Sequence, residues 1–419
     1  MNNGTLLYAQ SGGPTSVINN SLRGALEEAR KYEQIDHFYA AYHGVQGILR
    51  EDIFSLDNIC SREIVKLTQT PGAALGSCRY KLDKTKNDDF ERILEIFRKN
   101  NIRYFLYNGG NDSMDTCNKL SSYFNQIGYC CRVIGVPKTI DNDLVGTDHC
   151  PGYASCARFV SNMIAEVACD ASSYSNEQII VFEIMGRNAG WLVASTSLAK
   201  LTGYGPDLIY LPEVTFNLEK FIKDVEEVKK NKNVVIVAVS ESLKISENEF
   251  IGGLTEDNNN KDMFGHIQMG GVSEFLGDLL RRHFNTKVRT IEFSLLQRAA
   301  NHLASQLDLY EAYRVGAYAV KVSVDGTSGK MVTINRNSQN DDYQSTYGLI
   351  DLADVANKEK LFPIEWINST NNYVTDDYQK YALPLISNIR SRDNYAPFEL
   401  IDNGLPDFAD LSKYFYKNI

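Results

Sequence analysis

Short apolar runs alternate with stretches of helical periodicity over the first 150 residues of the chain. Runs rich in β-branched and aromatic residues predict buried strands, and apolar residues three or four positions apart predict helices between them. Expected strands lie at residues 5–10, 36–42, 102–108 and 131–136, and expected helices at 16–31, 88–100 and 114–126. This alternation predicts βαβ units and a largely parallel sheet.

The alternation continues beyond residue 150, with expected strands at 179–184, 207–211 and 233–239 and expected helices at 152–173, 191–200 and 218–230. A chain of 419 residues is longer than a single core usually spans. We therefore predict an α/β fold of two Rossmann-like domains with mostly parallel sheets and the active site in the cleft between them. The domains are expected at residues 1–150 (with part of 295–330) and 151–294. Residues 335–419 are expected to form an appended layer of helices and loops, packed on the second domain or at an interface.

Charged residues follow the apolar run at residues 133–136, where the carboxyl end of a parallel strand opens onto a crevice. This loop contains Lys138, Thr139, Asp141 and Asp143. A lysine beside two aspartates is more than the capping of a following helix requires. In a turn, the two carboxylates can serve one site in different roles.

Glycine pairs follow two other predicted strands, in SGGP at residues 11–14 and GGNDS at residues 109–113. Glycine lets the backbone come close to a ligand, with N–H groups directed at anionic oxygens. The helix expected after the second pair would point its N-terminus at the same crevice. Each pair alone is a weak signal, but three such loops at successive strand ends predict one site for phosphates and a divalent metal.

The composition restricts the classes of partner. A formal net charge of −10 and a pI near 5.3 argue against a nucleic-acid surface, so an anionic substrate must be drawn by a local cluster of Lys and Arg. The eight cysteines show no paired CxxC spacing and are expected to be reduced thiols. No apolar run reaches membrane-spanning length and the N-terminus lacks a signal-peptide pattern, which predicts a cytoplasmic protein that binds no membrane.

Seven segments together resemble the phosphofructokinase family over residues 6–320. They are SGGP (11–14), GAALGSCR (72–79), GGNDS (109–113), PKTIDND (137–143), EIMGRNAGWL (183–192), SES (240–242) and the run at 289–298. PKTIDND and MGRNAGW are highly specific as a pair. The resemblance implies transfer of a phosphoryl group to the 1-hydroxyl of fructose 6-phosphate.

Two positions indicate the phosphoryl donor. Family members that use ATP have glycine where this chain has Asp112 and Lys138, whereas members that use pyrophosphate have aspartate and lysine. An aspartate adds bulk and negative charge where the α-phosphate of a nucleotide would lie, and a lysine offers a point charge to the phosphoryl group in transit. The chain thus resembles the pyrophosphate-using branch, which implies a reversible reaction in glycolysis and gluconeogenesis.

The resemblance also implies roles for the donor-side residues. Asp141 would be the general base, Lys138 would steady the phosphoryl group, and Thr139 would donate its hydroxyl to the phosphate. Pyrophosphate and Mg²⁺ would be bound by Gly12, Gly13, Arg79, Asn111, Asp112 and Asp143, with Mg²⁺ held by the last three and several waters.

On the sugar side, the resemblance places Met185 and Gly186 against the sugar, with Arg187 as a hydrogen-bond donor. Glu241 would accept hydrogen bonds from sugar hydroxyls. Both substrates are small anions, so no macromolecular partner is implied beyond further copies of the chain.

Two segments compete for the 6-phosphate. GHIQMGG at residues 265–271 resembles a sugar-phosphate motif of ATP-using members, but only the run from Arg289 to Arg298 lies close before the helix expected at residues 313–320. We therefore assign the 6-phosphate to Arg289 and Arg298 and expect residues 265–271 to be structural, at a helix N-terminus. In this family one such arginine reaches across from a neighbouring subunit, which implies a homodimer or homotetramer.

Three residues depart from the family pattern. Asn111 stands where most members have an aspartate near the metal, and Gln178 and Leu295 stand where ATP-using enzymes have arginine and histidine. Three alternatives remain: an ATP-dependent 6-phosphofructokinase, a non-catalytic regulatory subunit that binds sugar phosphates, and a dinucleotide-binding dehydrogenase. The last lacks a G-x-G-x-x-G after its first strand. The sequence also leaves open a larger, seven-carbon sugar phosphate as substrate.

Overall fold

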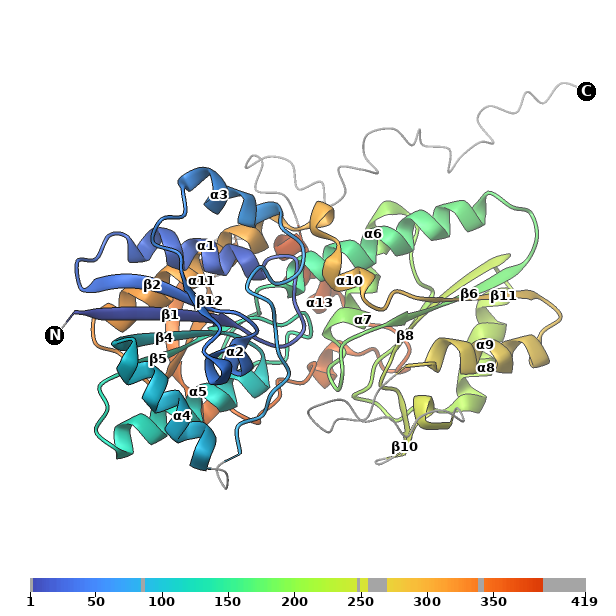
Figure 1. Ribbon diagram of the computed structural model, residues 1–419. Helices are drawn as coiled ribbons and strands as arrows, with labels where there is room; N and C mark the ends of the chain where they lie inside the picture. The colour runs from blue at the N-terminus through green and yellow to red at the C-terminus, as the bar shows by residue number, and fades with distance from the viewer. Residues whose placement is uncertain (1–2, 84–86, 247–248, 255–269, 338–342, 387–419) are drawn as a thin grey trace, which may run out of the picture.

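The computed structural model describes residues 3–83, 87–246, 249–254, 270–337 and 343–386 of the chain (Figure 1). Two α/β halves lie side by side, each built on its own sheet. No helix within these ranges is long and apolar enough to cross a membrane.

The first half contains a seven-stranded sheet in the order β13-β12-β5-β4-β1-β2-β3. Its strands are β1 (Gly4–Gln10), β2 (Ile35–Ala41), β3 (Ile53–Ser55), β4 (Ile102–Gly109), β5 (Arg132–Pro137), β12 (Lys330–Asn337) and β13 (Gln344–Asp351). The five inner strands run parallel, and the two edge strands are antiparallel to their neighbours. β1 is buried along its whole length, as expected for the middle of a sheet covered by helices on both faces.

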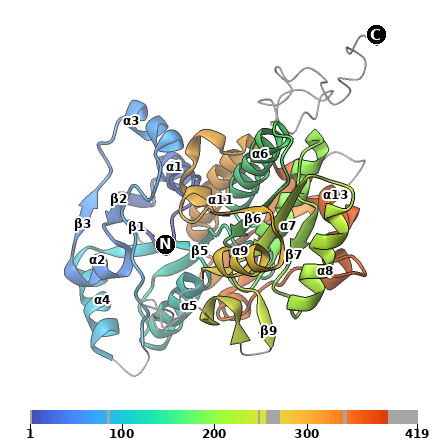
Figure 2. The same cartoon turned by 90° about the vertical axis from the view of Figure 1, so that its right-hand side faces the viewer.

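The helices α1 (Ile18–Ala29) and α11 (Gln306–Val324) cover one face of this sheet, and α2 (Gly44–Arg50), α4 (Asn87–Lys99) and α5 (Asn111–Gln126) cover the other. In the turned view, α11 lies between α1 and α6 (Figure 2). A side chain at Gly24 would come within 1.9 Å of the Tyr313 carbonyl oxygen, and one at Gly316 within 1.9 Å of that of Ser21. These two glycines let α1 and α11 cross closely. α11 therefore packs on the first half, although it comes late in the sequence.

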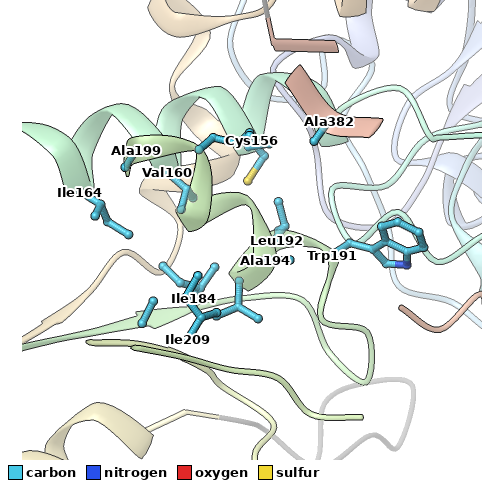
Figure 3. Packing of buried hydrophobic residues seen from close by; sticks show 14 of the residues in the cluster. Cys156, Val160, Ile164, Ile184, Trp191, Leu192, Ala194, Ala199, Ile209 and Ala382 are labelled. Carbon is cyan, nitrogen blue, oxygen red and sulfur yellow. The ribbon is translucent and has the colours of Figure 1, made fainter. Parts of the chain in front are cut away.

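The second half contains a parallel sheet in the order β11-β6-β8-β7. Its strands are β6 (Gln178–Ile184), β7 (Leu208–Tyr210), β8 (Val234–Ser240) and β11 (Lys287–Glu292). The helices α6 (Tyr153–Ser172) and α7 (Trp191–Ser195) cover one face, and α8 (Leu218–Lys229) and α9 (Val272–His283) cover the other. Figure 3 shows α6 and α7 packed on β6 and β7 through Val160, Leu192 and Ile184.

The structure corrects three of the expected elements. The helix expected at 114–126 begins at Asn111, and the one expected at 191–200 is α7 followed by a 3-10 helix, Thr196–Thr202. The expectation of helices and loops from residue 335 onward is wrong at its start, because β12 and β13 extend the first sheet. Polar residues 335–337 were misread as a loop because they end β12 against the exposed edge strand.

The rest of the described tail packs on the second half. α13 (Asp376–Ile386) and the segment before it insert Phe362, Tyr378 and Ala382 into the core beside α6 and α7 (Figure 3). The chain therefore passes from the edge of the first sheet, across the junction of the two halves, to the second core.

Candidate functional site

The loop that follows β5 carries the two aspartates and turns sharply between them. Asn142 has a left-handed backbone (φ 56°), a conformation that asparagine tolerates better than most residues. Its side chain is fully buried, accepts a hydrogen bond from the Cys150 N–H at 2.9 Å and donates to the Tyr381 hydroxyl at 3.0 Å. Asn142 therefore fixes the turn that sets Asp141 relative to Asp143.

Lys138 is a buried cation directed at the first glycine loop. Its Nζ donates to the Gly13 carbonyl at 2.8 Å, and a side chain at Gly12 would approach that Nζ to 3.2 Å. Burial lowers the pKa of Lys138 to about 7, although the nearby Asp141 carboxylate opposes the shift. An amine held in this way can give its charge or proton to a phosphoryl oxygen without reorganisation.

Glycines 12 and 13 make room for cations. A side chain at Gly13 would meet the Arg298 guanidinium at 2.4 Å, so Arg298 lies against the same loop as Lys138. The expectation that Gly12 offers its N–H to pyrophosphate is not met, because that N–H donates to the Cys78 carbonyl at 3.1 Å. Its left-handed φ of 76° and the space for Lys138 explain the glycine instead.

Asp143 carries the feature that best fits a metal ion. The carboxylate is buried and its Oδ1 has no hydrogen-bond partner. Burial and then the neighbouring Asp141 charge raise the pKa of Asp143 to about 7, and burial also raises that of Asp141. An unsatisfied buried carboxylate oxygen next to a second acid is stabilised by a cation. The donor set therefore fits a hard divalent ion.

Protein side chains alone do not form a closed metal cage. Over the described ranges, no group of three or more His, Cys, Asp or Glu residues is placed to hold an ion. This fits Mg²⁺, which keeps several waters and commonly shares substrate phosphates. Asn111 and Asp112 lie in the first turn of α5, whose N-terminus is capped at Gly110. Both side-chain groups of Asn111 bond to the tail, at the Asn357 N–H (2.7 Å) and the Lys358 carbonyl.

The loop after β6 brings Arg187 to the aspartates. Arg187 Nε lies 3.8 Å from Asp141 Oδ2, and Arg187 has a left-handed backbone (φ 51°). Glu241, at the end of β8, accepts the N–H groups of Gly186 and Arg187 at 3.1 and 3.0 Å. Burial raises the pKa of Glu241 to about 7. One oxygen of Glu241 therefore holds the Arg187 loop, a role that the sequence did not indicate.

Four other residues were predicted for the site: Thr139, Met185, Arg79 and Arg289. Thr139 accepts the Asp141 N–H at 3.1 Å through its hydroxyl oxygen, and Met185 is half-buried beside the Arg187 loop. Burial lowers the pKa of Arg298, and the nearby Arg79 charge lowers it further. Arg289 is exposed on the edge strand β11, opposite Ile180, and does not join the cluster in its own chain.

Residues 265–269 of the GHIQMGG segment lie outside the described residues, and Gly271 is the N-cap of α9. Sequence reasoning missed Lys360 and Trp191, which lie next to the two loops. Lys360 is in a polar stretch without a motif. Trp191 lies near the end of the EIMGRNAGWL motif, where the sequence predicted only the start of a helix.

Comparisons with known proteins agree in one family. The family model described as Phosphofructokinase matches residues 5–323. A protein of Halomonas elongata named pyrophosphate–fructose 6-phosphate 1-phosphotransferase is 39% identical over 97% of this chain and 96% of its own length, and the protein of that name from Methylococcus capsulatus is 38% identical over 96% and 95%. The crystal structure of a pyrophosphate-dependent phosphofructokinase from Nitrosospira multiformis has a TM-score of 0.82 at 36% identity, covering 97% of this chain and 96% of that chain.

Proposed function

Because this chain belongs to the phosphofructokinase family, we propose that it transfers a phosphoryl group from pyrophosphate to the 1-hydroxyl of fructose 6-phosphate. The products are fructose 1,6-bisphosphate and phosphate. The observation that carries the choice of donor is Lys138, a buried amine held against the Gly12–Gly13 loop and near Asp141. The fold and the relatives support the same reaction.

The base in this mechanism is Asp141. Its carboxylate is largely buried, with its side chain 15% exposed, and Arg187 Nε lies 3.8 Å away. Asp141 takes the proton of the sugar hydroxyl as the hydroxyl oxygen attacks the terminal phosphorus of pyrophosphate. Burial raises the pKa of Asp141, which makes it a stronger base than an exposed carboxylate, while the Arg187 charge keeps it ionised.

Lys138 and Arg298 supply positive charge at the donor. Both reach the Gly12–Gly13 loop, so phosphate oxygens above this loop meet two cations from different elements. Charge is transferred from the entering oxygen to the leaving phosphate, and fixed cations stabilise that shift without moving. Asp112, in the first turn of α5, adds negative charge and bulk that disfavour a longer nucleotide donor.

Mg²⁺ fits beside Asp143, whose buried Oδ1 lacks a hydrogen-bond partner. We assign Asp143 and Asp112 to the ion. The sequence also suggested Asn111, but its amide oxygen accepts the Asn357 N–H at 2.7 Å, so Asn111 is assigned to holding the tail on α5. When bound, the ion neutralises pyrophosphate charge and favours transfer of the phosphoryl group. The reaction is reversible because the transfer from pyrophosphate to the sugar hydroxyl changes the free energy little, and the same residues catalyse both directions.

The sugar phosphate is assigned to the loop after β6. Met185 and Gly186 lie against the sugar and Arg187 donates to it, with Glu241 holding the loop and offering its second oxygen. Arg289 is assigned to the 6-phosphate, whereas Arg298, for which the sequence suggested the same role, lies against Gly13 and is assigned to the donor instead. Because Arg289 is exposed on an edge strand, it serves a site only if a second copy of the chain packs there, as in a homodimer or homotetramer.

The test compares donors. Purified protein is mixed with fructose 6-phosphate, Mg²⁺ and either pyrophosphate or ATP, and fructose 1,6-bisphosphate is measured. Turnover with pyrophosphate and none with ATP is expected. Turnover with ATP alone would refute the donor assignment, and no turnover with either would favour a regulatory subunit.

A variant sharpens this comparison. Replacing Asp112 and Lys138 together by glycine, which ATP-using members have at both positions, should remove most pyrophosphate turnover, because the Lys138 amine lies against the Gly12–Gly13 loop. Lys380→Met, which removes an exposed charge on α13, is the control and should keep wild-type turnover.

A further inference from the structure

A short segment of the tail, residues 357–362, links the two loops that carry the reaction. We call it the strap. It follows α12 (Leu352–Val355), which contacts α5, and leads to Phe362, which is buried in the core of the second half. Its contacts reach both the aspartate loop and the Arg187 loop.

On the aspartate side, the strap is anchored through backbone and side chain. The Lys360 N–H donates to the Asp143 carbonyl at 2.7 Å. Lys360 Nζ donates to the Asp148 and Thr147 carbonyls at 2.8 and 3.1 Å, and lies 3.4 Å from Asn142 Oδ1. These bonds hold both ends of the segment at residues 143–148, directly after Asn142, and the Lys360 amine also reaches the Asn142 side chain.

On the sugar side, Lys360 and the preceding Glu359 hold the strap. The Lys360 carbonyl accepts the Trp191 indole N–H at 2.9 Å, and the Lys360 amine lies 5.0 Å from the Trp191 ring centroid. The Glu359 carboxylate accepts from the Asn188 amide at 3.2 and 3.3 Å. Asn188 belongs to the loop that presents Arg187, and Trp191, the first residue of α7, directly follows that loop.

A further bond fixes the far end of the strap. Glu213 Oε1 accepts both the Phe362 N–H at 2.9 Å and the Gly190 N–H at 2.8 Å. One buried carboxylate thus joins the strap to the residue before Trp191. At the near end, Asn357 donates to Asp115 at 3.0 Å, and Asn111 holds the backbone of the strap on α5.

We propose that Lys360 is a positioning residue for phosphoryl transfer, and that the strap sets the Asp141 loop against the Arg187 loop. This inference rests on the proposed function. Lys360 does not touch the reacting atoms. It acts through Asn142 and Asp143, because its amine and its N–H fix the turn between the base and the metal-binding carboxylate. Its carbonyl fixes Trp191 on the opposite loop at the same time.

The rate of phosphoryl transfer depends on how precisely the two loops are placed. Asp141 and Arg187 come from different halves, and their approach to 3.8 Å depends on how the two loops are held. Displacing a reacting group by about 1 Å can cost about 100-fold in rate. A single residue that bonds to both loops limits such displacement. Among these contacts, those of Lys360 alone reach both loops.

The test uses Lys360→Met in the full chain, which keeps the length of the side chain and removes its donors. We expect kcat with pyrophosphate to fall about 100-fold, with KM for fructose 6-phosphate changed by less than about threefold. Hydrogen exchange of backbone amides in residues 141–150 should become faster than in the wild type. Lys380→Met is the control, because that side chain is exposed on α13, outside the strap, and pairs with Asp377 at 3.0 Å, so kcat and exchange should stay unchanged.

A second variant covers the case in which Lys360→Met does not fold. Asn357→Gly removes the bond to Asp115 at an exposed position and tolerates the left-handed backbone (φ 59°). It should lower kcat several-fold and speed exchange in residues 141–150. Unchanged kcat in the folded Lys360→Met protein, or a lower kcat without faster exchange, would overturn the proposal; if that protein does not fold, Asn357→Gly decides by the same criteria.

The hydrogen-exchange measurement also distinguishes a failure of the strap proposal from a failure of the proposed function. If the wild type shows no turnover with pyrophosphate, the proposed function fails. Faster exchange at residues 141–150 in the variants would still support the strap as the element that holds the aspartate loop, and unchanged exchange would overturn it.

Discussion

Replacing Lys138 by methionine should make the protein more stable and much less active. Burial lowers the pKa of Lys138 from 10.5 to about 7, so this amine binds its proton less tightly in the folded chain than in the unfolded chain. Each factor of ten in proton affinity corresponds to about 1.4 kcal/mol. Near pH 7 the lysine therefore costs the folded state about 4 kcal/mol.

Methionine has a similar length and carries no charge, so it avoids that cost. It also loses the hydrogen bond to the Gly13 carbonyl, a loss of about 1–3 kcal/mol for a buried acceptor. The net expectation is a gain of roughly 1–3 kcal/mol in the free energy of unfolding. Loss of one preorganised charge at the transition state should lower kcat about 100- to 1000-fold.

The pH dependence gives an independent check. Between pH 7 and 10.5 the unfolded chain holds the Lys138 proton and the folded chain does not, so the contribution of this residue makes the protein more stable as the pH rises. Below pH 7 both states bind the proton and the penalty is constant. The variant should lack this rise.

The assay is urea unfolding without substrate at pH 7 and pH 9, together with steady-state kinetics using pyrophosphate. Lys358→Met, an exposed lysine, should change neither quantity. A Lys138→Met protein that unfolds at lower urea than the wild type, or that keeps kcat within about tenfold, would contradict the reasoning.

Three further predictions follow from the site and its surroundings. Burial opposes the charge on His149, but the Glu311 carboxylate and hydrogen bonds raise its pKa to about 9, so up to about 3 kcal/mol of stability should be present below pH 6.5 and lost as the pH rises to 9. Glu311→Gln should lower stability and flatten this loss, as measured by urea midpoints across that range. Arg187→Met should raise KM for fructose 6-phosphate about tenfold or more, while pyrophosphate KM stays near the wild-type value. Removing Mg²⁺ with EDTA should abolish turnover reversibly, and Asp143→Asn should raise the Mg²⁺ needed for half-maximal rate about tenfold or more; turnover that persists in EDTA would refute the metal assignment.

The strands and helices of both halves could be predicted because they depend on local patterns. β1, β4, β6 and β8 are short apolar runs in the sequence and buried strands in the structure. Two exceptions are β12 and β13. The end of β12 and most of β13 are polar and partly exposed, so they resemble a loop. Their strand conformation depends on pairing, since β12 pairs with β5, about 200 residues earlier in the sequence, and β13 pairs with β12.

The sequence also predicted which charged residues belong to the proposed site, because phosphoryl transfer requires residues of these types. Lys138, Asp141 and Arg187 stand in motifs that resemble those of one family, and the structure brings the three together. Their geometry could not be predicted. Asn142 and Arg187 have left-handed backbones, and each is held by a partly buried hydrogen bond to a distant segment.

By itself, the sequence determined the α/β class, the two parallel sheets and the set of charged loops at their strand ends, since these depend on local periodicity and residue type. Only the tertiary structure decided that Gly12 makes room for Lys138, that Glu241 holds the Arg187 loop and that Lys360 links the two halves. Each of these facts depends on contacts between segments distant along the chain. Such contacts leave no periodic signal, because a single hydrogen bond to a backbone carbonyl needs only one donor in the right place.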